Sequence, residues 1–351
     1  MPQIIYQDPG RGLAVFYSPT PSPELLRLLE GTVWGTRGVR YTKHGLAEAL
    51  ERLPAPLFFD LREEGRLAAG GVCLKKTVRV GDNSHEAIFT AALAVDPAQA
   101  GQGYGKFLAQ QARDWLLGEV KPGTILYGYI EAGNVRALKL GQQVGRQSLG
   151  SFEAVLFSRL RPREDARIRC CTPGEREELV ILLHTLYGDH ALLDFDHSVR
   201  NEDYYILRQG GKIAAGLQAE VQRWHMRSLP GLRGWLLVKL LPVLPVLGRR
   251  FDPRDFRFLK FSNFYLADGR EGEAFPLMES LLARHRVNFA MAYMDRRSPL
   301  YQRLARAGHL GVLGAGLKIS AQVMADFKGW SDWEIQAICR RPLHISPLDA
   351  L

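Results

Sequence analysis

A glycine-rich turn that joins a buried strand to a helix constrains the fold of this chain more than any other segment. The run 87–95 is continuously apolar and short enough to be a buried strand, and apolar residues recur at helical spacing over 106–117. The turn between them contains Gly101, Gln102, Gly103, Tyr104 and Gly105. Glycines at alternate positions permit backbone angles closed to other residues and let the main chain approach a ligand closely. The unit therefore predicts an α/β fold with a ligand at the strand-to-helix turn.

The helix start that follows this turn is a predicted anion site. Its first N–H groups have no partner within the helix, and the positive end of the helix dipole lies there. Lys106 adds a cation at the edge of the turn. The spacing GxGxG matches neither the GxGxxG of dinucleotide-binding folds nor the GxxxxGK[ST] of nucleoside triphosphatases. Two interpretations remain from the turn alone, a different phosphate-bearing ligand and a plain tight turn.

Strand-like and helical segments alternate along the whole chain. In the first half we expect helices at 22–29, 44–52, 106–117 and 134–144, and strands at 57–61, 67–75, 87–95, 124–130 and 151–160. In the second half we expect helices at 175–187, 274–284 and 299–307, and strands at 167–171, 204–207, 213–221, 258–266, 288–294 and within 311–322. The repeated order predicts a mixed α/β sheet in two tandem domains, 1–160 and 161–351. One fused α/β domain is the alternative.

A basic, apolar segment interrupts the repeat at 223–260. Its lysines and arginines far outnumber its acidic residues, and Trp224 and Trp235 accompany a leucine-rich centre. Such a segment suits the surface of an anionic membrane, a lid over a hydrophobic substrate, or a buried core helix with basic ends. The net charge of +9 agrees with an anionic partner. Nucleic acid is less expected, because the aromatic residues lie among leucines and are not interleaved with the charges.

The segment from Ala91 to Leu108 resembles the cofactor motif of the GNAT acyl-CoA N-acyltransferase superfamily, in which an apolar strand ends in V-x-P before [RQ]-x-x-G-x-[GA]. The sequence Asn134-Val-Arg-Ala137 is similar to the N-x-x-A start of the next helix in that family. The resemblance implies an N-acyltransferase, most simply an N-acetyltransferase, that uses acetyl-CoA or another acyl-CoA on an amine acceptor. It also implies a set of cofactor-binding residues, with Leu93 and Val95 at the pantetheine arm, Gly101, Gln102, Gly103, Tyr104, Gly105 and Lys106 at the pyrophosphate, and Asn134 near the thioester.

Two positions depart from the family pattern. Ala100 stands where the family has Arg or Gln, which costs one side-chain contact and leaves the backbone turn intact. Gly141 stands where the family often has a Tyr that protonates the leaving thiolate. A non-catalytic acyl-CoA-binding or sensor protein is therefore one alternative. A long-chain or lipid-linked acyltransferase at a membrane surface is another, and it depends on the segment 223–260.

Other groups could supply the acid or base that Gly141 lacks. Transfer from a thioester to an amine needs the amine deprotonated and the two reactants brought together. Glu86, or His85 beside it, could act as a base at the start of the strand 87–95. Glu131 lies at a strand end, and Tyr129, with Tyr127 on the same strand face, could donate a proton. For each residue the competing interpretation is an ordinary strand-edge polar group or a packed aromatic ring.

The second half is predicted to be a degenerate copy of the first. Its corresponding turn keeps Gly269 and Gly272 but adds Asp268, Glu271 and Glu273. Carboxylates at that position would repel a pyrophosphate at close range. We therefore expect the second half to wall the acceptor cleft or to recognise a partner.

Cysteine and histidine spacings suggest no metal site, since no CxxC pair occurs. The N-terminus lacks the basic and apolar regions of a signal peptide, and the longest apolar stretch, 229–248, is interrupted by Arg233, Lys239 and prolines. We expect a cytoplasmic protein, peripheral to a membrane if 223–260 binds one. The last residues, 340–351, are expected to form a loosely held terminus.

Overall fold

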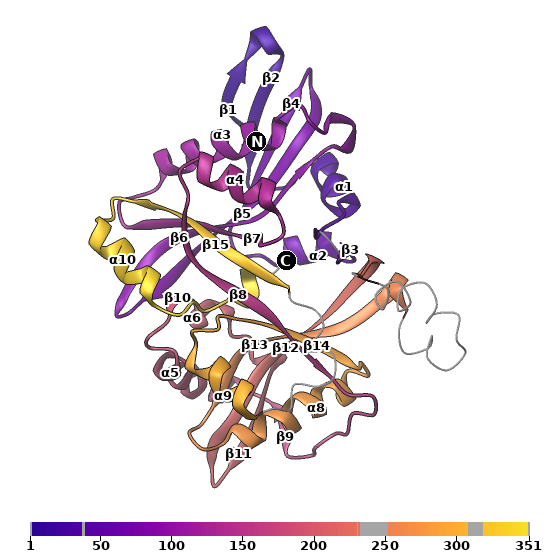
Figure 1. The fold of residues 1–351 in the computed structure, drawn as a ribbon, viewed down its shortest axis with the longest axis vertical. Coiled ribbons are helices and arrows are strands. Elements are labelled where there is room, and N and C mark those ends of the chain that lie inside the picture. Colours follow the sequence, from indigo (N-terminus) through magenta and orange to yellow (C-terminus); the bar gives the residue numbers. More distant parts are fainter. Residues whose placement is uncertain (1, 37–38, 230, 232–251, 308–318, 350–351) are drawn as a thin grey trace.

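The computed structural model describes residues 2–36, 39–229, 231, 252–307 and 319–349 (Figure 1). The strands are β1 (Gln3–Asp8), β2 (Leu13–Ser18), β3 (Arg40–Lys43), β4 (Pro56–Glu63), β5 (Arg66–Val80), β6 (Asn83–Val95), β7 (Thr124–Glu131), β8 (Gln147–Ser158), β9 (Ile168–Cys170), β10 (Ala191–Leu193), β11 (Tyr204–Gln209), β12 (Lys212–Ser228), β13 (Phe256–Leu266), β14 (Phe289–Met294) and β15 (Ser320–Lys328). The α-helices are α1 (Pro23–Gly31), α2 (Leu46–Glu51), α3 (Tyr104–Glu119), α4 (Val135–Gln143), α5 (Arg176–Leu186), α6 (Phe195–Ser198), α8 (Ala274–Arg284), α9 (Pro299–Ala307) and α10 (Asp332–Arg340).

The strands form one mixed sheet that runs through both halves of the chain. Its order is β1-β2-β4-β5-β6-β7-β15-β8-β14-β13-β12-β11-β9, with β10 paired to β5 and β3 paired to β12. The expected mixed α/β fold is therefore confirmed. α3 begins with Gly103 as N-cap and ends two residues beyond the predicted limit, while α8 and α9 have the predicted limits.

Among the described residues, five strand pairings join the two halves of the chain, and besides β10 with β5 and β3 with β12 they involve β15 and β14. β15 comes late in the sequence, yet it lies between β7 and β8 and pairs antiparallel with both. β8 in turn pairs with β14 along its length. The division at 160 remains a prediction about domains. Each half of the sheet therefore includes a strand from the other half of the chain, because β15 pairs with β7 and β8 pairs with β14.

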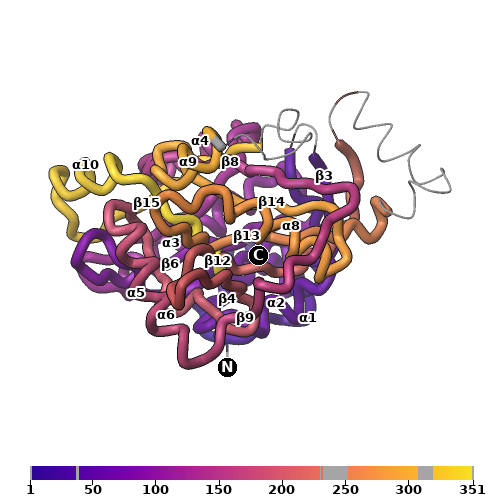
Figure 2. The backbone as a smooth tube through the Cα atoms, turned by 90° about the horizontal axis from the view of Figure 1, so that it is seen from below, coloured from indigo at the N-terminus to yellow at the C-terminus, as the bar shows by residue number. Residues whose placement is uncertain are grey.

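Helices cover the first half of the sheet on both faces. Leu108, Ala112 and Leu116 of α3 pack on one face against residues of β4 to β7. Leu25 and Leu29 of α1 pack on the opposite face. Across the molecule, α10 and the β3–β12 pair lie at opposite sides in both views (Figures 1 and 2).

The expectation of a loosely held terminus at 340–351 is wrong for the residues described there. Leu343 and Ile345 belong to the hydrophobic cluster beneath β5 to β7, and His344 and Ser346 are buried as well. The segment is anchored through a bridge between Ala191 and Leu343. Alternating apolar residues in an extended segment can fill a groove between two halves, and that packing is invisible in a single short stretch of sequence.

Some of the predictions made from the sequence concern residues that the structure does not describe. Within the basic segment 223–260, residues 230 and 232–251 are not described, so the expected membrane or lid role of Trp235 lies outside the structure. The described ends of that segment extend β12 and β13. The strands expected within 311–322 are described only from β15 onward.

Among the described helices, none has the length and apolar character needed to span a bilayer.

Candidate active site

The glycine turn is a cradle of unpaired backbone amides. Gly101 and Gly103 have φ of 92° and 85°, in the left-handed region that favours glycine. Gly103 is the N-cap of α3, where Phe107 N donates to Gly103 O at 3.0 Å. Within the described part of the chain, five amides have no hydrogen-bond acceptor, those of Gly101, Gly103, Tyr104, Gly105 and Lys106. The turn therefore presents donors and the positive end of a helix dipole to an anion.

A bulge opens the sheet directly beside this cradle. β6 and β7 pair in parallel from Ala87 to Thr90, and the pairing ends there. In the ladder with β5, Val72 faces Ala92 and Cys73 faces Thr90, which leaves Ala91 as an extra residue. A bulge of this kind bends its strand away from the neighbouring one. The backbone from Ala91 to Val95 is thus exposed along its β7 side, where an extended ligand could bind.

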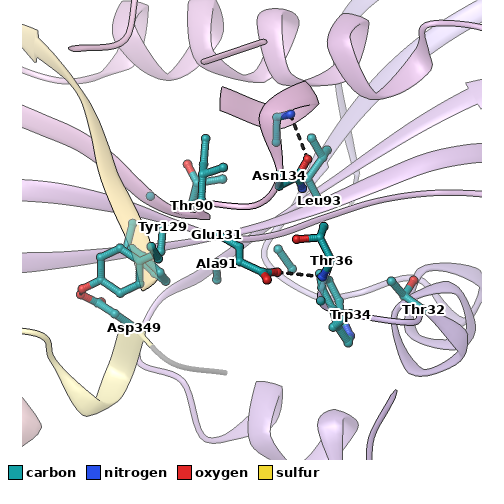
Figure 3. Close-up of a pocket in the computed structure, with 18 of the residues that line it drawn as sticks. Thr32, Trp34, Thr36, Thr90, Ala91, Leu93, Tyr129, Glu131, Asn134 and Asp349 are labelled. Carbon is teal, nitrogen blue, oxygen red and sulfur yellow. Dashed lines mark hydrogen bonds between the residues drawn. The ribbon is translucent and has the colours of Figure 1, made fainter. Parts of the chain in front are cut away.

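A cavity of about 540 Å³ passes through this opening from one face of the sheet to the other. On one side it reaches beneath α3 and α4, and on the other it reaches β3 and the strands of the second half. The cavity thus connects the two faces at the point where β6 and β7 separate. Figure 3 shows the central part, with Thr90, Ala91 and Leu93 on β6 and Tyr129 and Glu131 on β7.

The predicted cofactor residues lie partly at this opening and partly at the turn, outside the cavity lining. Leu93 and Asn134 line the cavity. Val95 lies at the end of β6, where its Cγ2 is 3.0 Å from the position a Cβ would take on Gly105. The hydroxyl of Tyr104 donates to Glu63, so its side chain points away from the turn. Lys106 and Gln102 are exposed at the turn itself.

Asn134 also caps the N-terminus of α4. Its Oδ1 accepts a hydrogen bond from Ala137 N at 3.1 Å and caps the first turn of α4 (Figure 3). An asparagine N-cap satisfies one of the orphan donors at a helix start. The side-chain amide nitrogen of Asn134 makes no hydrogen bond to another described residue.

Two of the three predicted catalytic residues lie at the cavity. Glu131 Oε2 accepts a hydrogen bond from Thr36 N at 2.8 Å (Figure 3). Tyr129 donates its hydroxyl proton to Asp349 Oδ2 at 2.7 Å. Burial, followed by the neighbouring Asp349 carboxylate, raises the pKa of Tyr129 well above its usual value. Tyr129 is therefore a protonated phenol held against a carboxylate.

The third predicted residue, Glu86, is not part of this site. Its Oε2 pairs with Lys75 Nζ at 2.8 Å, and its Oε1 accepts from Thr124 Oγ1 at 3.4 Å. His85 beside it contacts Gly123 O through Nδ1 at 3.2 Å. Both residues precede the stretch Ala87–Thr90 of β6 that pairs with β7, so this closed part of the sheet separates them from the opening. The cavity lining accordingly includes neither residue.

Asp349 is a cavity residue that sequence reasoning missed. Its Oδ2 accepts from Tyr127 and Tyr129, each at 2.7 Å, and its Oδ1 accepts from Lys76 Nζ at 2.6 Å. Lys76 Nζ also donates to Asp194 Oδ2 at 2.9 Å. Burial raises the pKa of Asp349, although the Lys76 ammonium opposes this. The only sequence signal was that Asp349 is the one acidic side chain of the segment 340–351.

Gly141, which stands at the position of the family tyrosine, lies between β7 and β15 at the cavity wall. A Cβ on Gly141 would lie 3.5 Å from Ile130 Cδ1 and 3.7 Å from Met324 Cε. Met324 belongs to β15, the strand that comes from the second half. A Cβ at 141 would thus touch β7 and β15 at ordinary van der Waals distances.

Beneath α3 and α4 the cavity has apolar walls made by small side chains. Its lining on this side includes Phe59, Gly71, Cys73, Leu108, Ala109, Ala112, Leu116, Leu140, Gly141 and Val144. Two arginines and one aspartate close its edge, because Asp326 accepts from Arg113 at 2.9 Å and from Arg146 at 3.1 Å. Arg146 also donates to Thr90 Oγ1 at 3.2 Å. We call this part the α3 arm.

The other end of the cavity lies against the second half and is called the β3 arm. Its walls combine aromatic and polar residues, namely Thr32, Trp34, Thr36, Tyr41, Lys43, Gln222, Trp224, Phe258, Lys260, Met291 and Tyr293. Trp224 stacks on Tyr41 with ring centroids 3.8 Å apart. The second half thus contributes part of the cavity wall.

The turn of the second half that corresponds to the cradle carries its own ion pairs. Arg303 pairs with Glu271 at 2.7 Å and with Asp268 at 3.4 Å. The two carboxylates at this turn therefore already hold a cation of the protein. The degenerate character of the second half remains a prediction.

Within the described residues, no group of three or more His, Cys, Asp or Glu side chains is arranged to hold a metal ion.

Comparisons with known proteins agree with this geometry. Residues 24–145 match the model of the acetyltransferase (GNAT) family. N-myristoyltransferase of Saccharomyces cerevisiae with bound myristoyl-CoA is structurally similar, with a TM-score of 0.59 at 10% identity over 89% of this chain and 82% of that one. The glucosamine N-acetyltransferase region of a fungal multi-domain β-N-acetylglucosaminidase gives a TM-score of 0.51 at 15% identity over 80% of this chain and 34% of that one. No curated protein sequence is significantly similar to the chain.

The N-myristoyltransferase fold is itself a tandem GNAT fold, and the similarity covers about nine tenths of the chain. The family match covers the cradle, the bulged strand and the start of α4. The fold is thus that of acyl-CoA-dependent N-acyltransferases. Residues 24–145 thus match the GNAT acetyltransferase family, and the fold of the chain is similar to the tandem GNAT fold of N-myristoyltransferase.

Proposed function

We propose that this protein transfers an acyl group from an acyl-CoA to an amine. The observation that supports this most is the single cavity that passes through the sheet beside the amide cradle. An acyl-CoA with its pyrophosphate at Gly101 to Gly105 would extend along the open edge of β6 and bring its thioester to the opening. The amine would approach from the β3 arm. Such an arrangement lowers the barrier by holding two reactants together.

We infer that Tyr129 and Asp349 form the acid–base pair of this reaction. The amine nitrogen bonds to the acyl carbon as the carbon–sulfur bond breaks. The amine proton passes to the Tyr129 oxygen while the Tyr129 proton moves to Asp349 Oδ2, to which it is already hydrogen-bonded. The pair then releases its proton, and the departing thiolate takes it up as free CoA. Glu131, held by Thr36 N, would orient the amine at the same opening.

The proposal is tested by binding and turnover measured separately. Calorimetry with CoA and with acetyl-CoA should show binding at one site per chain. Release of free thiol in the presence of a panel of amines should then show transfer. Absence of CoA binding would remove the proposal. Binding without turnover on any amine, and without acylation of the protein itself, would favour the alternative of an acyl-CoA sensor.

A valine at position 103 should weaken CoA binding by about 10-fold or more, since a β-branched residue at a φ of 85° costs about 1–3 kcal/mol. The matched control is Gly118→Val, near the end of the same helix, where a Cβ has open space and φ is not positive. Calorimetry with CoA should separate the two variants. Equal affinity in both would show that the turn does not hold the pyrophosphate.

The α3 arm supports an acyl group longer than acetyl. Small side chains at Gly71, Cys73, Ala109, Ala112 and Gly141 leave an apolar space beyond the opening that an acetyl group would not fill. Burying each additional methylene there contributes about 0.8 kcal/mol. The structurally similar N-myristoyltransferase was crystallised with a long-chain acyl-CoA, which is consistent with this assignment.

Replacing Ala112 by phenylalanine should fill the α3 arm. We expect the variant to lose activity or binding with octanoyl-CoA or longer thioesters by about 10-fold or more, and to keep acetyl-CoA. Gln110→Phe is the control, because it places the same ring on the exposed side of α3. Steady-state rates over a series of chain lengths measure the effect. An unchanged chain-length profile in Ala112→Phe would exclude the α3 arm as the acyl site.

A further inference from the structure

The β3 arm contains a cluster of hydrogen-bond donors that have no acceptor. Trp34 Nε1, Trp224 Nε1 and Thr36 Oγ1 are buried, and none has a hydrogen-bond partner among the described residues. All three residues line the cavity. Buried polar groups in native proteins are almost always satisfied, so orphan donors grouped at one cavity wall indicate a ligand that supplies acceptors.

Lys43 adds a positive charge at the same wall. Its ammonium lies 5.8 Å from the centroid of the Trp34 ring, and it forms no ion pair or hydrogen bond with another described residue. Its backbone partner in β12 is Trp224. Burial, followed by the charge of Lys260, lowers the pKa of Lys43 to about 7. An anion beside it would restore the ordinary pKa and stabilise the charged form.

The neighbouring charges are already balanced. Lys260 pairs with Glu220 at 2.8 Å and donates to Pro347 O at 2.9 Å. Glu220 also pairs with Arg200, which in turn pairs with Asp203 at 2.7 Å. Two cations and two carboxylates therefore cancel, which leaves Lys43 as the cation of this wall that has no carboxylate partner among the described residues. The cavity also contains the Glu131 carboxylate, which accepts from Thr36 N, so a monoanion beside Lys43 suits the site better than a phosphate dianion, whose second charge would be buried without compensation.

We propose that the acceptor is an amino carboxylate, whose amine lies at the opening near Glu131 and whose carboxylate is held by Lys43, Trp34, Thr36 and Trp224. This assignment rests on the proposed N-acyltransferase function. The carboxylate provides acceptor oxygens for donors that otherwise have none. The aromatic rings of Tyr41, Phe258 and Tyr293 favour an apolar body between the two polar ends. A free amino acid and the acidic end of a peptide share this chemistry.

The test uses a pair of ligands that differ only in the carboxylate. N-acetyl-phenylalanine and its primary amide are titrated into the full chain saturated with CoA, and the ratio of their affinities is measured by calorimetry. We expect the acid to bind about 10-fold or more tightly than the amide, because hydrogen bonds to a charged group are the stronger ones. In Lys43→Gln this preference should disappear, and in Lys43→Arg most of it should return. The surface control Lys212→Gln should retain the wild-type ratio.

A second experiment distinguishes a free amino acid from the carboxyl end of a peptide as the source of the carboxylate. Phenylalanyl-glycine, whose carboxylate lies one residue farther from the amine, is compared with phenylalanine as an acceptor in the thiol-release assay. A preference for phenylalanine assigns a free amino acid, and the reverse assigns a peptide end. Equal affinity of the acid and the amide in wild-type protein would overturn the inference while leaving N-acyl transfer intact. Failure of CoA itself to bind would instead remove the proposed function.

Discussion

Removing the hydroxyl of Tyr129 is expected to lower kcat by about 100-fold while leaving CoA affinity unchanged. In Tyr129→Phe the ring still packs against Phe89 and Phe152, but the hydrogen bond to Asp349 Oδ2 is lost. The proton of the amine then has no path to Asp349. Stability should fall by only about 1 kcal/mol, the usual cost of one hydrogen bond. Steady-state kinetics and thermal unfolding measure the two effects independently.

Tyr127 offers a closely matched control for this variant. Its hydroxyl donates to the same Asp349 oxygen at the same distance of 2.7 Å, yet Tyr127 is fully buried and does not line the cavity. Tyr127→Phe should therefore lose similar stability and keep near-normal kcat. If the two variants lost activity equally, the effect would come from disturbing Asp349, and Tyr129 would have no direct part in proton transfer.

Replacing Lys76 by methionine is expected to lower the free energy of unfolding by about 3–5 kcal/mol. The Lys76 ammonium is the shared partner of Asp194 and Asp349, and all three side chains are almost completely buried. Methionine has a similar length but no charge, so the variant leaves two carboxylates in a desolvated space without their cation. Because Asp349 belongs to the C-terminal segment, that segment should detach first. Chemical denaturation and proteolysis near residue 341 measure the two consequences.

The loss of stability in Lys76→Met should depend on pH in a direction set by the pKa values of Asp194 and Asp349. In the native protein burial alone would raise the pKa of Asp194, but the Lys76 ammonium, His344 and the hydrogen bond from Ser346 hold it below its usual value. Without Lys76 both carboxyls would have folded-state pKa values above the unfolded ones, so they destabilise the fold at neutral pH and cease to do so when protonated. The stability deficit of Lys76→Met should thus shrink as the pH falls from 7 towards about 5. A deficit that stayed constant would attribute the loss to packing and not to charge. Adding Asp194→Asn should recover part of the stability at pH 7.

Features that depend on neighbouring residues could be predicted from the sequence. The alternate glycines and the apolar run before them specify an anion cradle, because backbone angles and helix dipoles are local properties. The periodicity of α8 and α9 fixed their limits, since each helix must bury one face. Glu131 was predicted as a candidate because it ends a strand, and Tyr129 because it shares a strand face with Tyr127; both line the cavity.

Long-range packing decided the rest. Glu86 is as suitable chemically as Glu131, but the closed part of the β6–β7 ladder separates it from the opening. The hairpin β1–β2 and the short strand β3 were not anticipated, because their patterns are too short to distinguish from loops. The bulge at Ala91 depends on the register with β5, which no stretch of β6 reveals by itself.

By itself the sequence determined that this protein has a mixed α/β fold with a glycine-rich strand-to-helix turn of the GNAT kind. Only the tertiary structure decided what surrounds the reaction point, because Asp349 meets Tyr129 across 220 residues of chain and Glu131 meets Thr36 across 95. Such contacts arise when β15 and the C-terminal segment fill the space between the two halves. The types and spacing of the residues do not predict that packing, because side chains such as Asp349 and Thr36 have no distinctive sequence context and acquire partners only when the chain folds.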